Sequence, residues 1–327
     1  MQIIDTLRLV PFLTALDDRV LEQSASFWHH RSLLPGEVLW EQNTWSESLA
    51  ILLRGKMAVC VNDRQINHVQ EGELVGELNA FTIREQRIAT LRAEGACQLL
   101  LMPLDKMSDL AREHLELYNT VLDVALQQSV RRINAADLQI ARHAQGSMPA
   151  PRRRPESSLR KLWDAITRPE PKARPPSVIT LLRQLHGLFG ERDAVIGALG
   201  AAMEPVWVQA GQPLFLEGET GSSVFLIGDT EIEILRNVRG GDARKLVVLG
   251  PGSLVGTGVL IPGNARRSAS GVPTMNGWVY EMTHARHQEL TGQVERAWKE
   301  ALMGEIRDQI VVANQILSEV IVSEDAR

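Results

Sequence analysis

Cysteine is scarce in this sequence, which has only Cys60 and Cys97 among its 327 residues. Each lies in a strand-like apolar run, and neither has a metal-ligating residue at short spacing, so both are expected to be buried thiols. Of the eight histidines, His284 and His287 share a helical spacing, but no third ligand accompanies them. The sequence therefore favours buried thiols over a redox or iron–sulfur site, and solvated or packed histidines over a metal site.

Long apolar runs are also missing, so no segment is expected to span a membrane. The first six residues lack the basic region, apolar core and cleavage site of a signal peptide, which favours a cytoplasmic location. The net charge of −5 gives no general attraction to nucleic acids or anionic membranes. A hydrophobic content of 44% and a charged content of 23% are ordinary for a globular chain, and 327 residues are enough for two domains.

The first hundred residues contain short apolar runs separated by turn residues. Leu7 to Ser26 predicts short helices broken at Pro11. The strand-like runs that follow are 32–40 around a Pro-Gly turn, 48–61 as a hairpin bent at Arg54-Gly55, and 87–102 as two strands around Glu94-Gly95. Short strands at such close intervals indicate a small antiparallel barrel or roll.

A long helical pattern follows, from Asp109 to about His143, without proline or glycine. Its apolar seam recurs every three or four residues: Leu115, Tyr118, Leu122, Ala125, Ser129, Ile133, Ala136 and Ile140. The seam either packs on its own barrel or pairs with another subunit. We favour pairing over part of its length, because the barrel covers only a few turns.

Residues 146–176 form a linker that holds seven of the fifteen prolines and a local charge of +5. Within it, Leu159 to Ile166 has apolar residues at helical spacing, which predicts either a partner-docking helix or a clip onto one domain, and we favour the clip. The basic run Arg152 to Arg154 has no interleaved aromatics and is read as a solvated charge run. The expected domains are 1–145, the linker 146–176, and 177–327.

The second domain repeats the first. The run Pro35 to Ile51 aligns without a gap to Ala210 to Leu226, and Asn43 falls opposite Gly218, as expected where the backbone is left-handed. The second domain also ends in a helical pattern, whose apolar stripe is Trp298, Leu302, Ile306, Ile310, Ala313, Leu317 and Val320.

One stretch of the first domain has the chemistry of a binding site. Gly76-Glu77-Leu78 is followed by Arg87-Ile88-Ala89-Thr90, so that an arginine stands ten residues after a glutamate. The glutamate can accept hydrogen bonds from sugar hydroxyls, the guanidinium can donate to phosphate oxygens, and the threonine adds a hydroxyl. The corresponding residues of the second domain are Gly256, Thr257, Arg267, Ser268 and Ser270.

These motifs resemble the phosphate-binding cassette of the cyclic nucleotide-binding domains, a family that includes the catabolite activator protein, protein-kinase regulatory subunits and gated channels. The resemblance covers Leu7 to Ala144 and Ser177 to Val322. It implies an α+β fold of two antiparallel β-rolls, each flanked by helices and followed by a long amphipathic helix.

The resemblance also implies roles for individual residues. Glu77 would bind the ribose 2′-hydroxyl and Arg87 the cyclic phosphate, with backbone NH groups near Leu78, Asn79 and Ala89 completing the cradle. Two residues depart from the family pattern: Val75 replaces an aromatic residue and Asn79 a small apolar one. Ile88 stands where relatives that prefer cyclic GMP often carry threonine, which favours cyclic AMP as the ligand.

The second cassette has lost its carboxylate, since Thr257 replaces the glutamate and a neutral hydroxyl is a poorer ribose acceptor. We expect a structural copy that binds no nucleotide, with Arg267 as the residue that still offers a phosphate contact.

No helix-turn-helix follows either long helix, so direct DNA binding is not expected. No His-x-His metal motif and no nucleophile with a base can be assembled, so the sequence does not predict an enzyme. Two hypotheses remain. The chain is a cyclic nucleotide sensor that signals through its long helices to an unidentified protein partner, as a homodimer, or it is a dimeric scaffold whose cassettes are relics.

Overall fold

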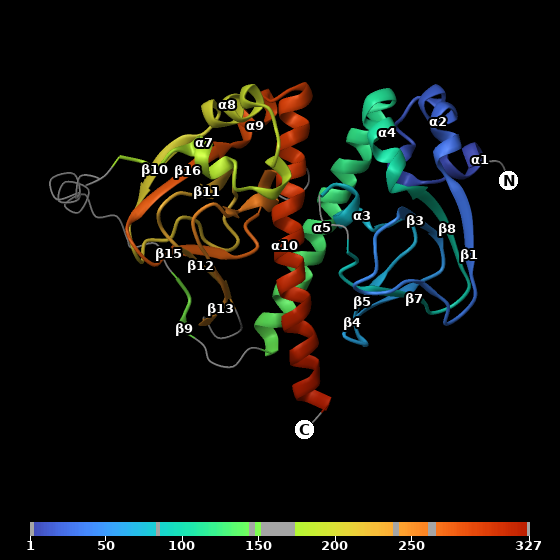
Figure 1. Cartoon of the computed structure of the whole chain (residues 1–327). Helices are drawn as coiled ribbons and strands as arrows, with labels where there is room; N and C mark the ends of the chain where they lie inside the picture. Colours follow the sequence, from blue (N-terminus) through green and yellow to red (C-terminus); the bar gives the residue numbers. More distant parts are fainter. Residues whose placement is uncertain are drawn as a thin grey trace. The chain divides into compact units, whose positions relative to one another are not determined.

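The structure is a computed structural model, and it describes residues 3–82, 86–143, 148–151, 174–237, 242–260 and 266–325 (Figure 1). The predicted helical segment at 159–166 and the basic run at 152–154 lie outside the described residues. The chain divides into two compact units: residues 1–136 with 299–327 form unit 1, and residues 137–298 form unit 2.

Unit 1 contains an antiparallel β-roll made of two four-stranded sheets, ordered β1-β8-β3-β6 and β2-β7-β4-β5. Its strands are β1 (His29–Leu33), β2 (Val38–Trp40), β3 (Ser48–Arg54), β4 (Met57–Val61), β5 (Arg64–Val69), β6 (Leu74–Val75), β7 (Thr90–Ala93) and β8 (Cys97–Pro103). Its helical elements are α1 (Ile3–Leu7), η1 (Pro11–Leu13), α2 (Asp18–Ser24), η2 (Ala25–Phe27), α3 (Glu77–Ala80), η3 (Leu104–Lys106), α4 (Met107–Glu113) and α5 (Leu115–His143). The expected roll and flanking helices are thereby confirmed.

The predicted hairpin at 48–61 is wrong. β3 pairs with β6 and β8, whereas β4 pairs with β5 and β7, so the two strands belong to different sheets. The chain changes sheets at Gly55, whose φ of 100° is left-handed and where an added Cβ would lie 2.6 Å from the carbonyl oxygen of Ala96. Only glycine meets both conditions at low cost, so the glycine turn in the sequence marks a corner of the roll.

The core of the roll lies between the two sheets. Its fully buried residues come from strands of both sheets and include Leu52, Met57 and Leu99. Cys60 and Cys97 are both buried and free, as the sequence predicted.

Unit 2 repeats this architecture, with sheets ordered β10-β16-β11-β14 and β15-β12-β13-β9. Its strands are β9 (Met148–Pro149), β10 (Glu204–Val208), β11 (Ser223–Ile227), β12 (Ile232–Asn237), β13 (Asp242–Leu249), β14 (Leu254–Val255), β15 (Ser270–Pro273) and β16 (Gly277–Thr283). Its helical elements are α7 (Val178–Leu182), η4 (His186–Leu188), α8 (Asp193–Ala201), η5 (Thr257–Leu260), α9 (His284–Glu289) and the start of α10 (Gly292–Asp325). The two halves of the chain are therefore similar in fold as well as in sequence.

The helix predicted from Asp109 is interrupted. His114 leaves the helical conformation, with φ −134° and ψ 54°, and separates α4 from α5. Its ring packs edge-on against Phe27 at 5.6 Å, and this contact accompanies a break that no proline or glycine announces.

The seam of α5 is covered within the chain. Leu122, Ala125 and Ser129 are each 0% exposed, and the part of α10 from Lys299 onward belongs to the same compact unit as residues 115–136 of α5. This part of the seam is thus not a free face for a second subunit.

Candidate functional site

The first cassette begins at a glycine that the geometry requires. Gly76 follows β6 and precedes α3 with φ 81° and ψ 4°, a left-handed conformation. A Cβ at this position would lie 2.6 Å from Nη1 of Arg87 and 2.9 Å from the carbonyl oxygen of Ser48. The glycine therefore lets the backbone approach the arginine directly.

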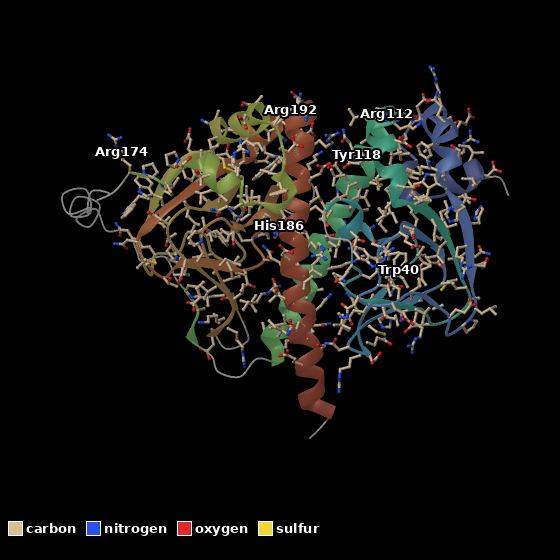
Figure 2. The ribbon with its side chains drawn as sticks, in the orientation of Figure 1. Trp40, Arg112, Tyr118, Arg174, His186 and Arg192 are labelled. Carbon is tan, nitrogen blue, oxygen red and sulfur yellow. The ribbon has the colours of Figure 1, made fainter. Side chains whose placement is uncertain are left out.

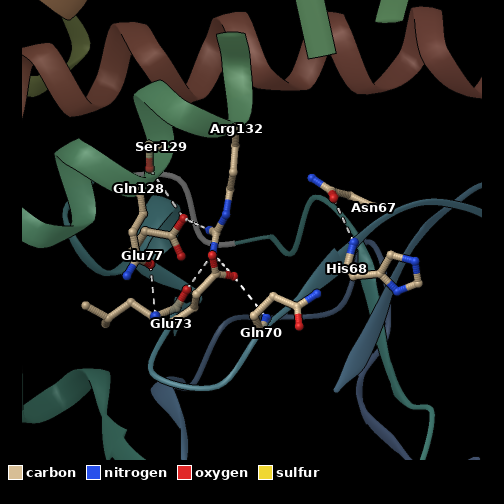
Figure 3. A network of polar contacts seen from close by, with 9 residues as sticks. Asn67, His68, Gln70, Glu73, Glu77, Gln128, Ser129 and Arg132 are labelled. Carbon is tan, nitrogen blue, oxygen red and sulfur yellow. Dashed lines mark hydrogen bonds and ion pairs between the residues drawn. The ribbon is translucent and has the colours of Figure 1, made fainter. Parts of the chain in front are cut away.

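Glu77 is held by α5, as Figure 3 shows. The carboxylate is 1% exposed and pairs with Nη1 of Arg132, and its Oε1 accepts a longer hydrogen bond of 3.4 Å from Oγ of Ser129. The same guanidinium donates through Nη2 to the carbonyl oxygen of Leu74 at 2.8 Å, and Oε1 of Gln128 accepts from the Leu74 amide at 2.9 Å. Three residues of α5 thus fix the first turn of the cassette.

Arg87 is almost fully buried, at 3% exposed. Its Nη2 donates to the carbonyl oxygen of Ser48 at 2.7 Å, and its guanidinium carbon lies 3.5 Å from the centroid of the Trp40 ring, a cation–π contact. Figure 2 labels Trp40 within the unit 1 roll. Within the described part of the chain, Nε and Nη1 have no hydrogen-bond acceptor. Two buried donors are therefore uncommitted.

Arg87 remains positively charged at neutral pH although it is buried. Desolvation lowers the pKa of this guanidinium to about 10, while the nearby carboxylates of Glu77 and Glu47 act in the opposite direction. At neutral pH the group is a cation in a dry environment, where a hydrogen bond to an anion is strong. Glu77 therefore lies near enough to Arg87 to act on its charge.

The remaining predicted residues of the first cassette are wholly or partly buried. Leu78 and Ala89 are buried and Ile88 is partly buried. Asn79, which departs from the family pattern, donates from Nδ2 to the carbonyl oxygen of Gln86 at 2.8 Å. Its amide therefore ties the start of the cassette to the residue before Arg87. Its backbone NH donates to the Gly76 carbonyl at 3.2 Å, so this NH, one of those expected in the cradle, is already used within α3.

Thr90 supports the cassette in a way that the second unit repeats. Its Oγ1 accepts from the amide of Gln42 at 2.9 Å, and Oγ of Ser270 accepts from the amide of Glu217 at the same distance. Ser270 is 1% exposed and Ser268 is partly buried. A hydroxyl at this position anchors the neighbouring turn in both units.

The second cassette reproduces the arginine environment without the carboxylate. Gly256 has φ 75°, and Arg267 lies 4.4 Å from the ring of Phe215, which aligns with Trp40. Arg267 donates from Nη2 to the carbonyl of Ser223 at 2.7 Å and from Nη1 to the carbonyl of Gly256 at 3.0 Å. Burial lowers the pKa of Arg267 to about 10. Thr257, 6% exposed, replaces the glutamate.

The two arginines differ in their free donors. Arg267 has both terminal nitrogens bound to backbone oxygens and only Nε uncommitted among the described residues, whereas Arg87 keeps both Nη1 and Nε. Among the described residues, Arg87 therefore has more guanidinium nitrogens without a hydrogen-bond acceptor than Arg267 has.

Sequence reasoning missed the residues that surround the predicted site. Arg132 is 55 positions from Glu77, and no motif links them. Ser129 could have been noticed in the sequence, because it is a hydroxyl residue within an otherwise apolar seam. In the structure it is 0% exposed. Trp40 and Ser48 stood within the repeated run, but their contact with the arginine depends on the roll.

Neither a metal site nor a membrane span is found in the part of the chain that the structure describes. No cluster of three or more histidine, cysteine, aspartate or glutamate side chains is placed to hold a metal ion there. Among the same residues, no helix combines the length and the apolarity needed to cross a bilayer.

Comparison with known proteins gives one family in both halves of the chain. The profile of the cyclic nucleotide-binding domain matches residues 30–114 and 205–293, which together exceed half of the sequence. The cyclic AMP receptor protein of Thermus thermophilus is 37% identical over 88 residues, 27% of this chain and 38% of that protein. This chain therefore spans well under half the length of that relative. The cAMP-activated global transcriptional regulator CRP of Salmonella typhimurium is 23% identical over 158 residues, 47% of this chain and 73% of that protein.

Solved structures with low sequence identity also align. The regulatory domain of Toxoplasma gondii PKA, solved with cAMP, is 16% identical, covers 90% of this chain and 92% of that chain, and has a TM-score of 0.32. A cyclic nucleotide-binding protein from Geobacter metallireducens is 18% identical, covers 38% of this chain and 93% of that chain, and has a TM-score of 0.35.

Proposed function

Because this chain belongs to the cyclic nucleotide-binding domain family and carries two copies of the domain, we propose that it is a cyclic nucleotide sensor whose first copy binds a cyclic mononucleotide. The observation that carries the proposal is Arg87, a buried cation under the electrostatic influence of Glu77, with two guanidinium nitrogens that have no acceptor among the described residues. A cyclic phosphate would supply acceptors for those donors. A ribose hydroxyl would donate to Glu77, whose carboxylate can accept several hydrogen bonds.

Cyclic AMP is the favoured ligand. Two relatives are named for cyclic AMP, and Ile88 stands where threonine is expected for cyclic GMP. The second cassette is proposed to bind no nucleotide, because Thr257 cannot replace a carboxylate and Arg267 is largely satisfied by backbone oxygens.

We propose output to a protein partner through the long helices, in a cytoplasmic protein without enzymatic activity or direct DNA binding. Repeat boundaries at 1–145 and 177–327, with a linker at 146–176, belong to the same proposal. A homodimer would need a surface other than the part of the α5 seam already buried within the chain.

One observation favours the second candidate function, a scaffold with relic cassettes. Both predicted ligand groups already have partners within the chain: Glu77 pairs with Arg132, and Arg87 contacts Trp40 and the Ser48 carbonyl. Nucleotide binding must therefore compete with these contacts, and a site that binds nothing would have the same apo structure.

Calorimetry with cyclic AMP, cyclic GMP and a cyclic dinucleotide separates the two functions. We expect cyclic AMP to bind, and Arg87→Ala to weaken its binding by about 10- to 100-fold, since a hydrogen bond to a charged group contributes about 1.5 to 3 kcal/mol. Arg267→Ala is the matched control, because Arg267 is also buried, has an aromatic neighbour and donates to the same kind of carbonyl partner. If none of the three nucleotides binds, the sensor function is refuted and the scaffold function remains. A loss with Arg267→Ala equal to that with Arg87→Ala would show that the first site is not the specific one.

A further inference from the structure

The last helix of the second repeat packs as part of unit 1. α10 begins in unit 2, but from Lys299 onward its residues belong to unit 1. There it buries an apolar stripe: Met303 and Ile306 are 0% exposed, and Ile310 is 4% exposed. Val312, on another face of the same helix, is 47% exposed. The helix is therefore docked along one face.

Polar contacts fix this docking at both ends of the interface. Oη of Tyr118 on α5 donates to Oε1 of Glu300 at 2.5 Å, and Nζ of Lys299 lies 2.7 Å from Oδ1 of Asp123. Farther along α10, Oγ of Ser318 accepts from Nδ2 of Asn62, between β4 and β5, at 3.4 Å. Figure 1 shows this part of α10 beside α5, and Figure 2 labels Tyr118 on that helix.

One residue joins this interface to the nucleotide site. Ser129 is fully buried on α5, and its Oγ lies 3.4 Å from Oε1 of Glu77 and 3.9 Å from Sδ of Met303. Glu77, the proposed ribose acceptor, is thus separated from α10 by a single side chain. Two side chains of α5, Arg132 and Ser129, contact the Glu77 carboxylate.

We infer that the second repeat serves as a helix donor for the first nucleotide site. Its own cassette lacks the carboxylate, but its terminal helix covers the seam of α5 that would otherwise require a second subunit. α10 then supports the geometry of Glu77 and is the element outside the first repeat that responds to the nucleotide. This regulatory role rests on the proposed function, whereas the docking of α10 on α5 does not.

Substitutions in α10 of the full chain test the inference. Ile306→Asp places a charge in the buried stripe, Ile306→Ala is a milder change in case the first variant does not fold, and Val312→Asp introduces the same charge at an exposed position. Hydrogen exchange is measured over residues 118–133, cyclic AMP binding by calorimetry, and molecular mass by light scattering.

Ile306→Asp should weaken the packing of α10 on α5, because burying an unpaired charge is strongly unfavourable. We therefore expect the hydrogen-exchange rate of residues 118–133 to rise at least about tenfold and the affinity for cyclic AMP to fall at least about tenfold. Ile306→Ala should change both in the same direction by less, and Val312→Asp should change neither. Faster exchange with unchanged affinity would overturn the regulatory role, and unchanged exchange would overturn the docking. A dimeric mass with exchange that increases on dilution would assign the helix to a second copy and overturn the inference.

Failure of the proposed function gives a different result. If the wild-type chain binds no nucleotide, the sensor role and the regulatory half of the inference both fail. The exchange measurement still decides whether α10 is the partner of α5 within the chain.

Discussion

Replacing Arg132 by methionine should destabilise the first cassette by about 3 kcal/mol. Removing one member of a buried ion pair typically costs about 3 to 5 kcal/mol, because the other charge stays buried without a partner. The Glu77 side chain is 2% exposed but that of Arg132 is 22% exposed, which places the expected cost at the lower end. The variant also loses the 2.8 Å hydrogen bond to the Leu74 carbonyl.

A double-mutant cycle isolates the ion pair. With Glu77→Gln in the same chain as Arg132→Met, neither member of this ion pair is charged, so the double variant should be more stable than the two single losses added together. We expect a coupling in the upper part of the range of about 0.5 to 3 kcal/mol that is found for residues in direct contact. Arg131→Met, an exposed neighbour on the same helix, is the control and should have little effect.

The assay must report on unit 1 alone, because two compact units need not unfold together. Hydrogen exchange of peptides from residues 115–136 gives the local free energy of opening for α5. If the two single changes add to within about 0.5 kcal/mol, the carboxylate and the guanidinium are independent, and the description of α5 as the holder of Glu77 is wrong.

Two further predictions concern the corner of the roll and pH. Gly55→Ala should cost about 2 kcal/mol or more, since its Cβ would lie 2.6 Å from the Ala96 carbonyl at φ 100°, whereas Gly36→Ala, at φ 85° with no atom within 4 Å, should cost only about 1 kcal/mol in urea unfolding. Equal losses would contradict the steric argument. Burial raises the pKa of half-buried Asp137 to about 6, against the opposing charge of Arg236. Between pH 4 and 6 the Asp137 carboxyl is therefore protonated in the folded state but ionised in the unfolded state. The free energy of unfolding should fall by about 2 kcal/mol as the pH rises through this range. Subtracting the pH profile of Asp137→Asn from that of the wild type should reveal this loss, and identical profiles would refute it.

Local signals were sufficient for much of the fold. Proline, glycine and alternating apolar residues placed most strands of unit 1, because turn chemistry and strand periodicity depend on neighbouring residues. Because the second half of the sequence repeats the first, the same pattern of strands could be predicted for unit 2. Errors occurred where distant contacts decide the structure, as at Gly55, where consecutive strands enter different sheets, and at His114, where packing against Phe27 accompanies a helix break.

The sequence by itself determined that the chain has two copies of one domain and that the first copy keeps both a glutamate and an arginine. Gly76 and the ten-residue spacing are local features of the sequence, so they can be recognised without coordinates, and the left-handed conformation of Gly76 is a local constraint of its turn. Only the tertiary structure decided that Arg132 pairs with Glu77 and that Trp40 covers Arg87. It also decided that the part of α10 from Lys299 onward packs in one compact unit with this part of α5. These contacts join residues tens to hundreds of positions apart, and such pairs are selected by how apolar faces and buried charges are satisfied in the folded chain.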